Sequence, residues 1–411
     1  MTRLARVAAC ACLLQALAAT AAAQGILQRP ALPDPAETGR FRLGFVRFTP
    51  SVNISNVGVD TNVFNEREDP KQDVTASFGP RAEFWSRLGP RARVYGSTGL
   101  DYQYFQQYES QRSFGTSNIG RVELDLGRLT PFAEGQFTST RIRPGFEIDS
   151  RARREDVSGR AGLALRVQSR TTVMGWAREE RFRYGAGEEF LETNLSRALD
   201  RDSTYVGGGA VIELTPLTSV HIDAELGEDR FVRSPDRNAD TWKVLPGFKF
   251  KPFALISGTL AVGYRQFDTV SALVPDFGGV IAAVDLGYVL RATRFTGRYN
   301  RDVTYSFENL EPYYLQTDWT FGVTQKITDA WDLVGRAGRY RLDYETVGLP
   351  GLTERTDSGL QYGGGVGYTL GQYVRLGVDV TFMERTSVAD IARSYEGTRA
   401  GFSVSYGLKQ R

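Results

Sequence analysis

Residues 374–382 read Val-Arg-Leu-Gly-Val-Asp-Val-Thr-Phe, an alternation in which every second residue is apolar. Residues 315–324 repeat this pattern, as do residues 121–126 and 220–227. Successive side chains of a β-strand point to opposite faces, so each segment predicts a strand with one apolar and one polar face. The segments run to about 10–14 residues, the length that a tilted strand needs to cross a bilayer. A soluble β-sandwich would show the same alternation, so the period predicts strands without placing them in a membrane.

The connections between these segments alternate between short and long along the chain. Eight short ones lie at 88–90, 129–131, 168–170, 216–218, 252–254, 291–293, 328–330 and 370–372, and nine longer ones lie near 62–71, 109–113, 146–153, 186–200, 233–239, 269–277, 308–311, 346–355 and 387–394. Together they join 18 strands and put both ends of the barrel region on the short-turn side. Short periplasmic turns and longer extracellular loops are typical of bacterial outer-membrane barrels. We therefore expect an all-β, transmembrane antiparallel β-barrel of about 18 strands over residues 44–408.

Aromatic residues gather at the predicted strand ends, where amphipathic rings would meet the two surfaces of a bilayer. Those that follow short turns are Phe132, Phe253, Phe295, Trp331 and Tyr373. Those on the loop side are Tyr104, Tyr108, Phe114, Phe182, Tyr184, Phe231, Trp242, Phe267, Tyr305, Tyr313, Tyr344 and Tyr395. The core of a soluble β-protein would not concentrate its aromatics at strand ends, so this distribution favours a membrane barrel with two aromatic belts.

The first 43 residues have a different character. Arg3 and Arg6 precede an apolar run, and residues 21–23 read Ala-Ala-Ala, which together predict a secretory signal peptide over residues 1–23. Residues 24–43 contain three prolines and no apolar period, and they predict a flexible periplasmic N-terminal segment. A protein exported in this way and built as a barrel is expected in the bacterial outer membrane.

Composition excludes several functions. Cys10 and Cys12 are the only cysteines of the 411 residues, and both lie in the predicted signal peptide, so disulfides and cysteine-bound metals are not expected in the mature chain. Removing Arg3 and Arg6 with that peptide cancels the net charge of +2, so nothing suggests nucleic acid as a partner. No later run approaches the ~18 apolar residues of a membrane-spanning helix.

A short motif resembles a known family. The putative β-barrel porin (type 2) family typically ends its first strand in a Tyr-Asp-Asp-Asn-aliphatic-Phe-like segment, and residues 59–64 read Val-Asp-Thr-Asn-Val-Phe. Asp60, Asn62 and Phe64 match, whereas Val59 and Thr61 depart from it. Members of this family are outer-membrane barrels that often accompany surface-polysaccharide systems, so the resemblance implies a barrel over about residues 44–408 without a defined substrate.

The end of the chain carries a second pattern. Outer-membrane barrels commonly finish with a strand reading polar-x-Gly-x-x-apolar-x-aromatic, which the barrel-assembly machinery recognises, and Arg399, Gly401, Val404 and Tyr406 fit it. Five residues follow Tyr406, so the pattern is displaced from the last position. We expect this segment to act as the assembly signal.

The chemistry-bearing residues lie on the polar faces of the predicted strands. His221 is the only histidine and has Asp223 and Glu225 in phase with it, which suggests either a proton relay or, more simply, polar residues of a barrel lumen. The predicted lumen-facing residues are Arg121, Glu123, Asp125, Arg166, His221, Asp223, Glu225, Arg298, Asp318, Arg375 and Asp379. They would either tune the ion selectivity of a pore or pair with one another across neighbouring strands. We expect no catalytic residues, no metal site and no cofactor.

Residues 186–200 form the longest predicted loop. Leu191, Leu195, Ala198 and Leu199 recur at helical spacing, with Glu188, Glu189 and other charges on the remaining faces, which predicts one or two turns of amphipathic helix. So short a helix needs a surface to pack on. It would either fold inward and narrow the channel, through Glu188, Glu189, Leu191, Leu195 and Leu199, or lie over the rim. General porins narrow their pore with an earlier loop, which here is residues 146–153.

These observations lead to three functional hypotheses. The first is a porin-like channel for the passive passage of small hydrophilic solutes, and the second is a port or accessory barrel for surface-polysaccharide export. The third is a structural or adhesive surface barrel. The expected partners are outer-membrane lipid and lipopolysaccharide, the barrel-assembly machinery, and small hydrophilic solutes or polysaccharide.

Overall fold

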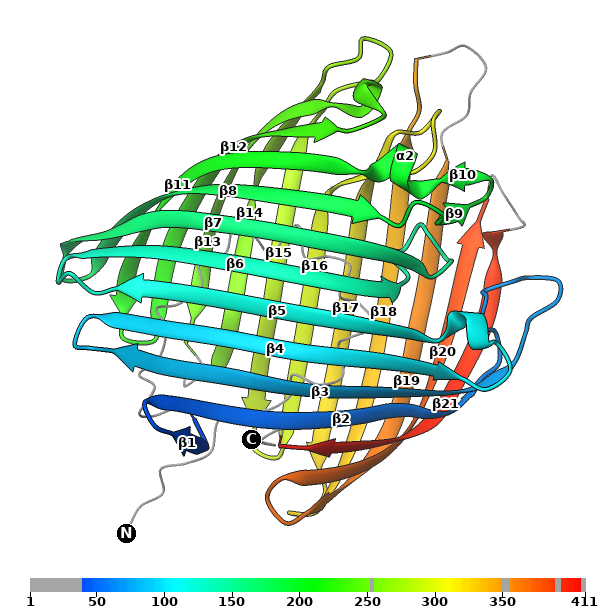
Figure 1. Ribbon diagram of the computed structural model, residues 1–411, viewed down its shortest axis with the longest axis horizontal. Coiled ribbons are helices and arrows are strands. Elements are labelled where there is room, and N and C mark those ends of the chain that lie inside the picture. The colour runs from blue at the N-terminus through cyan, green and yellow to red at the C-terminus, as the bar shows by residue number, and fades with distance from the viewer. Residues whose placement is uncertain (1–38, 252–254, 349–354, 389–392, 408–411) are drawn as a thin grey trace.

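The structure, a computed structural model, describes residues 39–251, 255–348, 355–388 and 393–407. Eighteen long strands follow one another in chain order and close into an antiparallel barrel, as predicted (Figure 1). The strands are β2 (Val46–Asp60), β3 (Asp73–Leu88), β4 (Ala92–Phe105), β5 (Ser113–Leu124), β6 (Leu129–Ile142), β7 (Ala152–Gln168), β8 (Thr171–Tyr184), β11 (Arg201–Thr215), β12 (Thr218–Phe231), β13 (Ala239–Phe250), β14 (Ile256–Thr269), β15 (Phe277–Leu290), β16 (Thr293–Tyr305), β17 (Tyr313–Lys326), β18 (Trp331–Glu345), β19 (Thr356–Leu370), β20 (Val374–Ser387) and β21 (Tyr395–Tyr406).

The barrel closes where the first long strand meets the last. β2 pairs with β21 from Val52 opposite Tyr406 to Asp60 opposite Arg399, with a bulge between Ile54 and Val57. Closure leaves no row of unpaired backbone groups facing lipid, where each such group would cost several kcal/mol. The sequence pattern that ends at Tyr406 lies in β21, the strand that completes the barrel, and its role as an assembly signal stays a prediction.

Short elements fill the remaining connections. They are β1 (Phe41–Leu43), η3 (Glu109–Gln111), β9 (Glu189–Phe190), β10 (Thr193–Asn194), α2 (Leu195–Leu199) and η4 (Pro235–Arg237). β1 corrects the prediction that residues 24–43 are flexible throughout, because a tight turn with Gly44 at φ +60° folds Phe41 back opposite Phe48 of β2. The predicted signal peptide lies outside the described residues. Along the described chain, no helix has the length and apolarity to span a membrane.

One of the predicted turns is displaced. The connection expected at 129–131 lies at 125–128, and residues 129–131 begin β6, where Pro131 pairs with Leu163. The turn forms earlier because Gly127 adopts φ +84° and donates its N–H to Asp125 Oδ1 at 3.0 Å. The turn expected at 252–254 lies outside the described residues.

The two faces of the wall differ as the alternation predicts. On β20, Leu376, Val378 and Phe382 are 42%, 48% and 41% exposed on the outer wall, while Arg375 and Asp379 form ion pairs within the barrel. Apolar side chains turned outward would be costly in water but suit a hydrocarbon environment. The wall is therefore built to stand in a bilayer with a polar interior.

The loop-side aromatic belt is only partly as predicted. Trp242 and Phe114 are exposed on the outer wall, at 40% and 66%. Others in the predicted belt are buried in apolar clusters among the loops, namely Tyr184, Phe231, Phe267, Tyr313 and Tyr344. These rings pack against loop residues at the long-loop end of the barrel, so strand-end position alone did not distinguish a lipid-facing ring from one that supports the loops.

Candidate functional site

The inner wall carries ion pairs that run from strand to strand. Arg121 on β5 places Nη2 2.6 Å from Glu123 Oε1 and Nη1 3.3 Å from Glu134 Oε2 on β6. In another sector of the inner wall, Glu225 Oε1 of β12 lies 2.9 Å from Arg178 Nη2 and 3.5 Å from Lys243 Nζ. These side chains lie along the wall with little exposure, because each charge is compensated by a neighbour on the same strand or on a nearby strand.

His221 and Asp223 form a buried pair on β12. The His221 Nδ1 atom lies 2.7 Å from Asp223 Oδ2, and His221 Nε2 has no hydrogen-bond partner within the described residues. Glu225, the third member of the suggested relay, is engaged elsewhere, since it accepts a hydrogen bond from Trp176 Nε1 at 3.3 Å besides its two ion pairs. This arrangement favours polar residues of the wall over a proton relay.

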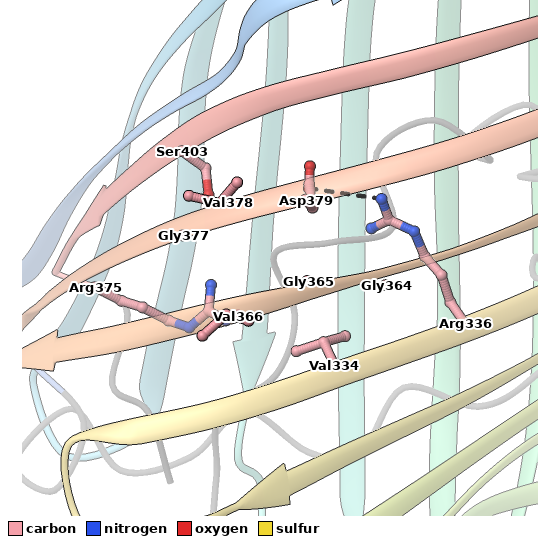
Figure 2. Close-up of a pocket in the computed structure, with 10 residues that line it drawn as sticks. All are labelled: Val334, Arg336, Gly364, Gly365, Val366, Arg375, Gly377, Val378, Asp379 and Ser403. Carbon is pink, nitrogen blue, oxygen red and sulfur yellow. Dashed lines mark ion pairs between the residues drawn. The ribbon is translucent and has the colours of Figure 1, made fainter.

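The predicted lumen residues Arg375 and Asp379 of β20 are also paired, and Figure 2 shows the ion pair of Asp379 with Arg336. Arg375 Nη2 lies 2.5 Å from Asp332 Oδ1, and Arg336 Nη2 lies 3.5 Å from Asp379 Oδ1. Figure 2 shows both arginines lying along the wall beside a hollow of about 10 Å³, which has room for about one water molecule. This hollow is too small to be a solute site.

Arg298 and Asp318 also have polar partners on the adjacent strand or on their own strand. Arg298 Nη2 lies 2.8 Å from Asp285 Oδ2, and Asp318 Oδ1 accepts hydrogen bonds from Asn300 and Gln316 at 3.3 and 2.7 Å. These contacts follow the same pattern of charge paired with neighbouring polar groups.

Two predicted lumen residues are placed differently. Asp125 is not on a strand, because β5 ends at Leu124, and its carboxylate caps the exposed turn at Gly127. Arg166 shares the inward phase of β7 but is exposed near the short-turn end of that strand. Neither belongs to the paired wall.

The most elaborate arrangement lies at the long-loop end, which we call the mouth. The β6–β7 loop, residues 143–151, makes contacts with strands on the far side of the ring. In the order of eighteen strands, β6 and β7 are fifth and sixth, whereas β16 and β17 are thirteenth and fourteenth. Yet Glu147 accepts hydrogen bonds from Ser306 Oγ at 2.6 Å and from Phe307 N at 3.3 Å in the β16–β17 loop. The β6–β7 loop therefore crosses the mouth.

Aromatic contacts support this crossing. Phe146 stacks on Tyr340 of β18 with ring centroids 4.3 Å apart and an interplanar angle of 16°. Ile148 is 4% exposed and packs in one cluster with Phe307 and Leu195. Apolar burial thus adds to the hydrogen bonds that hold the loop in place.

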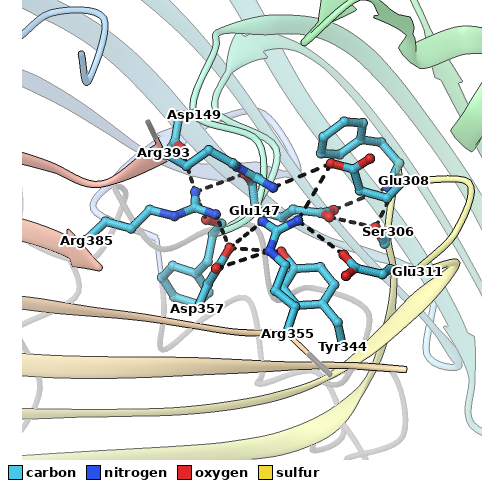
Figure 3. Close-up of polar contacts among 12 residues, drawn as sticks. Glu147, Asp149, Ser306, Glu308, Glu311, Tyr344, Arg355, Asp357, Arg385 and Arg393 are labelled. Carbon is cyan, nitrogen blue, oxygen red and sulfur yellow. Dashed lines mark hydrogen bonds and ion pairs between the residues drawn. The ribbon is translucent and has the colours of Figure 1, made fainter. Parts of the chain in front are cut away.

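Charged residues from four segments meet around the crossing loop, and we call them the mouth cluster (Figure 3). Its members are Glu147, Asp149, Glu308, Glu311, Arg355, Asp357, Arg385 and Arg393. Its centre is Arg385, whose fully buried side chain places Nη1 2.5 Å from Asp149 Oδ2 and Nη2 2.6 Å from Asp357 Oδ2. Arg385 Nη1 also donates to the carbonyl oxygens of Phe146 and Glu147, each at 3.0 Å. One guanidinium therefore joins the β6–β7 loop to β19 and β20.

Two further arginines complete the cluster. Arg355 places Nη2 2.6 Å from Asp357 Oδ2 and Nη1 3.1 Å from Glu311 Oε2, with its guanidinium 4.3 Å from the centre of the Tyr344 ring. Arg393 Nη2 donates to the Glu147 carbonyl oxygen at 2.8 Å, and its Nη1 lies 3.6 Å from Glu308 Oε1. Arg237 supports this side by donating to the carbonyl oxygens of Phe307 at 3.1 Å and Glu308 at 2.7 Å.

Burial changes the acidity of the loop carboxylates. Removal from water raises the pKa of Glu147 to about 7, although the Ser306 hydroxyl and the Arg393 charge act in the opposite direction. Burial also raises the pKa of Asp149, against the lowering effect of Arg385. The loop thus contains carboxyl groups that hold their protons more tightly when docked than they would in water.

The motif residues of the first strand secure the seam beside this site. Asp60 Oδ2 accepts from Arg399 Nε at 2.8 Å, and Asn62 Nδ2 donates to the Glu396 carbonyl oxygen at 2.8 Å. Phe64 packs edge-on against Tyr108 at 4.9 Å. Asp60 and Asn62 therefore tie the end of β2 to β21, which gives the motif a physical role in closing the barrel.

The β8–β11 loop contains the predicted helix in shortened form. α2 has five residues, and Asn194 caps it by accepting from Arg197 N. Leu195 and Leu199 are buried, at 0% and 3% exposure, in the cluster that includes Ile148 and Phe307. The assignment of Leu191 to the same helical face is wrong: it lies in the turn between β9 and β10 at φ +47° and is 53% exposed.

The two acidic residues predicted to narrow the channel, Glu188 and Glu189, make local contacts or are exposed. Glu188 lies 3.9 Å from Arg141 Nε, and its carbonyl oxygen accepts from Leu195 N at 2.9 Å. Glu189 is exposed in β9. α2 packs beside the crossing loop, in the cluster that contains Ile148. This position does not test whether residues 186–200 narrow the channel, which stays a prediction.

Sequence reasoning missed the mouth cluster. Its members come from loops and strand ends that are far apart in the chain, so no spacing rule brings Glu147 and Arg385 together. One signal was present: residues 143–151 hold Phe146 and Ile148 among charged residues. Apolar side chains in a connecting loop indicate that the loop packs on something.

The closed barrel and its polar interior define a porin-like β-barrel of the outer-membrane class. The family model described as "Putative beta-barrel porin 2" matches residues 34–407, and the chain belongs to that family, which confirms the resemblance noted in the sequence. This family membership and the closed barrel together point to the bacterial outer membrane. The sequence matches no curated protein.

Similar solved structures are outer-membrane proteins at low sequence identity. A BenF-like porin from Pseudomonas fluorescens Pf-5 has a TM-score of 0.47 at 10% identity, over 89% of this chain and 99% of that one. The outer membrane protein opdK from Pseudomonas aeruginosa has a TM-score of 0.44 at 10% identity, over 87% and 97%. A bacterial polysaccharide outer membrane secretin has a TM-score of 0.34 at 10% identity, over 88% and 99%.

Proposed function

We propose that this protein is an outer-membrane channel for the passive passage of small hydrophilic solutes, narrowed at its extracellular mouth by the β6–β7 loop. The observation that carries the proposal is the combination of barrel size and inner-wall chemistry. Eighteen strands close at a backbone diameter of about 36 Å, which side chains alone do not fill. The inward side chains are charged and paired along the wall, so the space between them is suited to water and polar solutes.

The proposal needs no catalytic chemistry. Within the described ranges, no group of three or more His, Cys, Asp or Glu residues is placed to hold a metal ion. His221 pairs with Asp223 in the wall rather than with a nucleophile. We therefore assign the charged residues to pairing and hydration of the lumen. The partners in this proposal are lipid, the barrel-assembly machinery and the transported solute.

Reconstitution tests the channel directly. The full-length mature protein in planar bilayers is expected to give discrete conductance steps, and proteoliposomes should swell in small sugars but not in large dextrans. A protein that is folded, as judged by a shift of gel mobility on boiling, yet silent in both assays would contradict the channel and favour a structural or adhesive barrel.

A second candidate is a port for surface-polysaccharide export. The hydrogen-bonded crossing of the mouth by Glu147, Arg385 and Arg393 favours it, because a port must stay closed until its substrate arrives. An export port would show rare openings that anionic or neutral oligosaccharides increase or block. A passive porin would conduct steadily and respond to them weakly.

A further inference from the structure

The outer wall over β16 to β18 carries three arginines beside an aromatic residue. Arg301 pairs with Thr317, and Thr317 pairs with Arg341, so these three residues share one face of the sheet. On the same face, Trp319 pairs with Arg339 and is 40% exposed. Because Trp319 and Phe321 look outward from the barrel, the arginines lie on the lipid side of the wall, at the long-loop end of the apolar band.

These arginines are poorly compensated by carboxylates. Arg301 donates only to neutral oxygens, the Val280 carbonyl at 3.2 Å and Thr317 Oγ1 at 3.4 Å. Arg339 is exposed and has no carboxylate partner within the described residues. Only Arg341 is paired, through Nε at 2.6 Å from Asp343 Oδ1, and its side chain stays 60% exposed. The patch therefore has an excess of positive charge.

Arginines on another sector of the outer wall differ in this respect. Arg181 on β8 places Nε 3.1 Å from Asp202 Oδ1, and Arg230 on β12 places Nη2 2.6 Å from both Glu228 and Asp240. Both arginines thus have carboxylate partners, Asp202 and Asp240 on adjacent strands and Glu228 on the strand of Arg230 itself. Excess positive charge is thus a property of the β16–β18 sector rather than of every outward arginine at this end.

We propose that Arg301, Arg339 and Arg341 form a binding site for the phosphate groups of lipopolysaccharide in the outer leaflet. Guanidinium groups bind phosphate through paired, charge-assisted hydrogen bonds. A tryptophan beside them suits the boundary between acyl chains and headgroups. Arg301 and Arg341 are two strand spacings apart, roughly 10 Å, so the site spans more than one phosphate.

The site does not depend on the channel function, because it requires only that this wall face the outer leaflet. Its ligand source is a lipid headgroup rather than free phosphate. We choose the lipid source because the arginines lie next to an outward apolar band. A lipid can place its acyl chains on that band while its phosphates contact the guanidinium groups.

The test measures lipopolysaccharide binding by the full-length mature protein in phosphatidylcholine nanodiscs. A triple variant, Arg301→Gln with Arg339→Gln and Arg341→Gln, is expected to bind bisphosphorylated lipopolysaccharide on the order of tenfold more weakly than wild type. Arg181→Gln, which removes an outward but paired arginine, should bind as wild type does. Lipopolysaccharide stripped of its phosphates should bind wild type as weakly as the intact form binds the triple variant.

Several outcomes would overturn the proposal. Unchanged binding by a folded triple variant would do so, and equal loss in Arg181→Gln would show a general charge effect. Full displacement by millimolar inorganic phosphate would mark a free-anion site instead of a lipid site. If the triple variant fails to fold, the single variant Arg339→Gln tests the proposal, because Arg339 is exposed and its replacement breaks no ion pair. This variant should lose part of the affinity for lipopolysaccharide, and unchanged affinity would overturn the proposal.

Discussion

We predict that Glu147 makes the docking of the β6–β7 loop dependent on pH. Its pKa is about 7 in the docked loop, against an ordinary value of 4.5, because burial disfavours the charged form. The docked loop therefore binds the proton more tightly than the free loop does. Docking is strongest below about pH 4.5 and weakens as the pH rises through about 7. The difference between the two pKa values corresponds to about 3 kcal/mol, or about two orders of magnitude in the ratio of docked to free loop.

The charged groups around Glu147 do not reverse the rise of its pKa. The charges of Arg393 and Arg355 lower the pKa of Glu147, but they act against the larger effect of burial. Arg237 approaches from the β12–β13 loop, and burial lowers the pKa of that arginine only to about 10. Asp149, in the same loop, also has a raised pKa and adds an effect of the same sign.

Single-channel recording in planar bilayers checks this prediction. Conductance or open probability of the wild type should rise between about pH 5 and about pH 8, as the loop undocks. Glu147→Gln, which carries a neutral amide in place of the carboxyl group, should stay in the low-conductance state over the whole range. Glu109→Gln is the matched control, because Glu109 is a loop carboxylate whose side chain is 73% exposed. The same pH profile in wild type and Glu147→Gln would refute the reasoning.

The remaining predictions concern the mouth cluster and the seam. Arg385→Gln leaves Asp149 and Asp357 without their shared cation, so it should destabilise the docked loop by about 3–5 kcal/mol and expose Arg143 and Arg151 to trypsin; resistance equal to wild type would argue against the cluster as a latch. Deleting residues 188–198 removes the buried Leu195 and should raise single-channel conductance at unchanged barrel yield, whereas an unchanged conductance would place this loop at the rim. Asn62→Ala, which removes the hydrogen bonds to Glu66 and Glu396, should lower the temperature at which the gel-mobility shift is lost, whereas Asn118→Ala on the outer wall should lower it less. Deleting residues 397–411 should abolish membrane assembly, because most of β21 is lost and β2 and β20 are left unpaired, while deleting residues 407–411 should be tolerated; normal surface levels of the longer truncation would count against the seam as an assembly requirement.

Much of the barrel could be predicted from local patterns. Residues 374–382 specify their strand because a period of two separates apolar from polar side chains, and a strand is the only backbone with that period. Chain order then specifies the topology, since short turns join neighbouring antiparallel strands. The displaced turn at Asp125 and Gly127 shows the limit of this reasoning: a local turn preference moved the boundary by a few residues without changing the strand order.

Only the tertiary structure determines that the β6–β7 loop crosses the mouth. Glu147 and Arg385 are 238 positions apart in the chain, and they meet because the barrel brings the ends of β6, β19 and β20 around one opening. The same closure determined which strand-end aromatics face lipid and which pack among the loops, as Trp242 and Tyr184 illustrate. A sequence pattern reports which face of a strand is apolar, because that depends on residues two apart. It does not report which loops meet across a ring, because that depends on the number, tilt and register of strands between them.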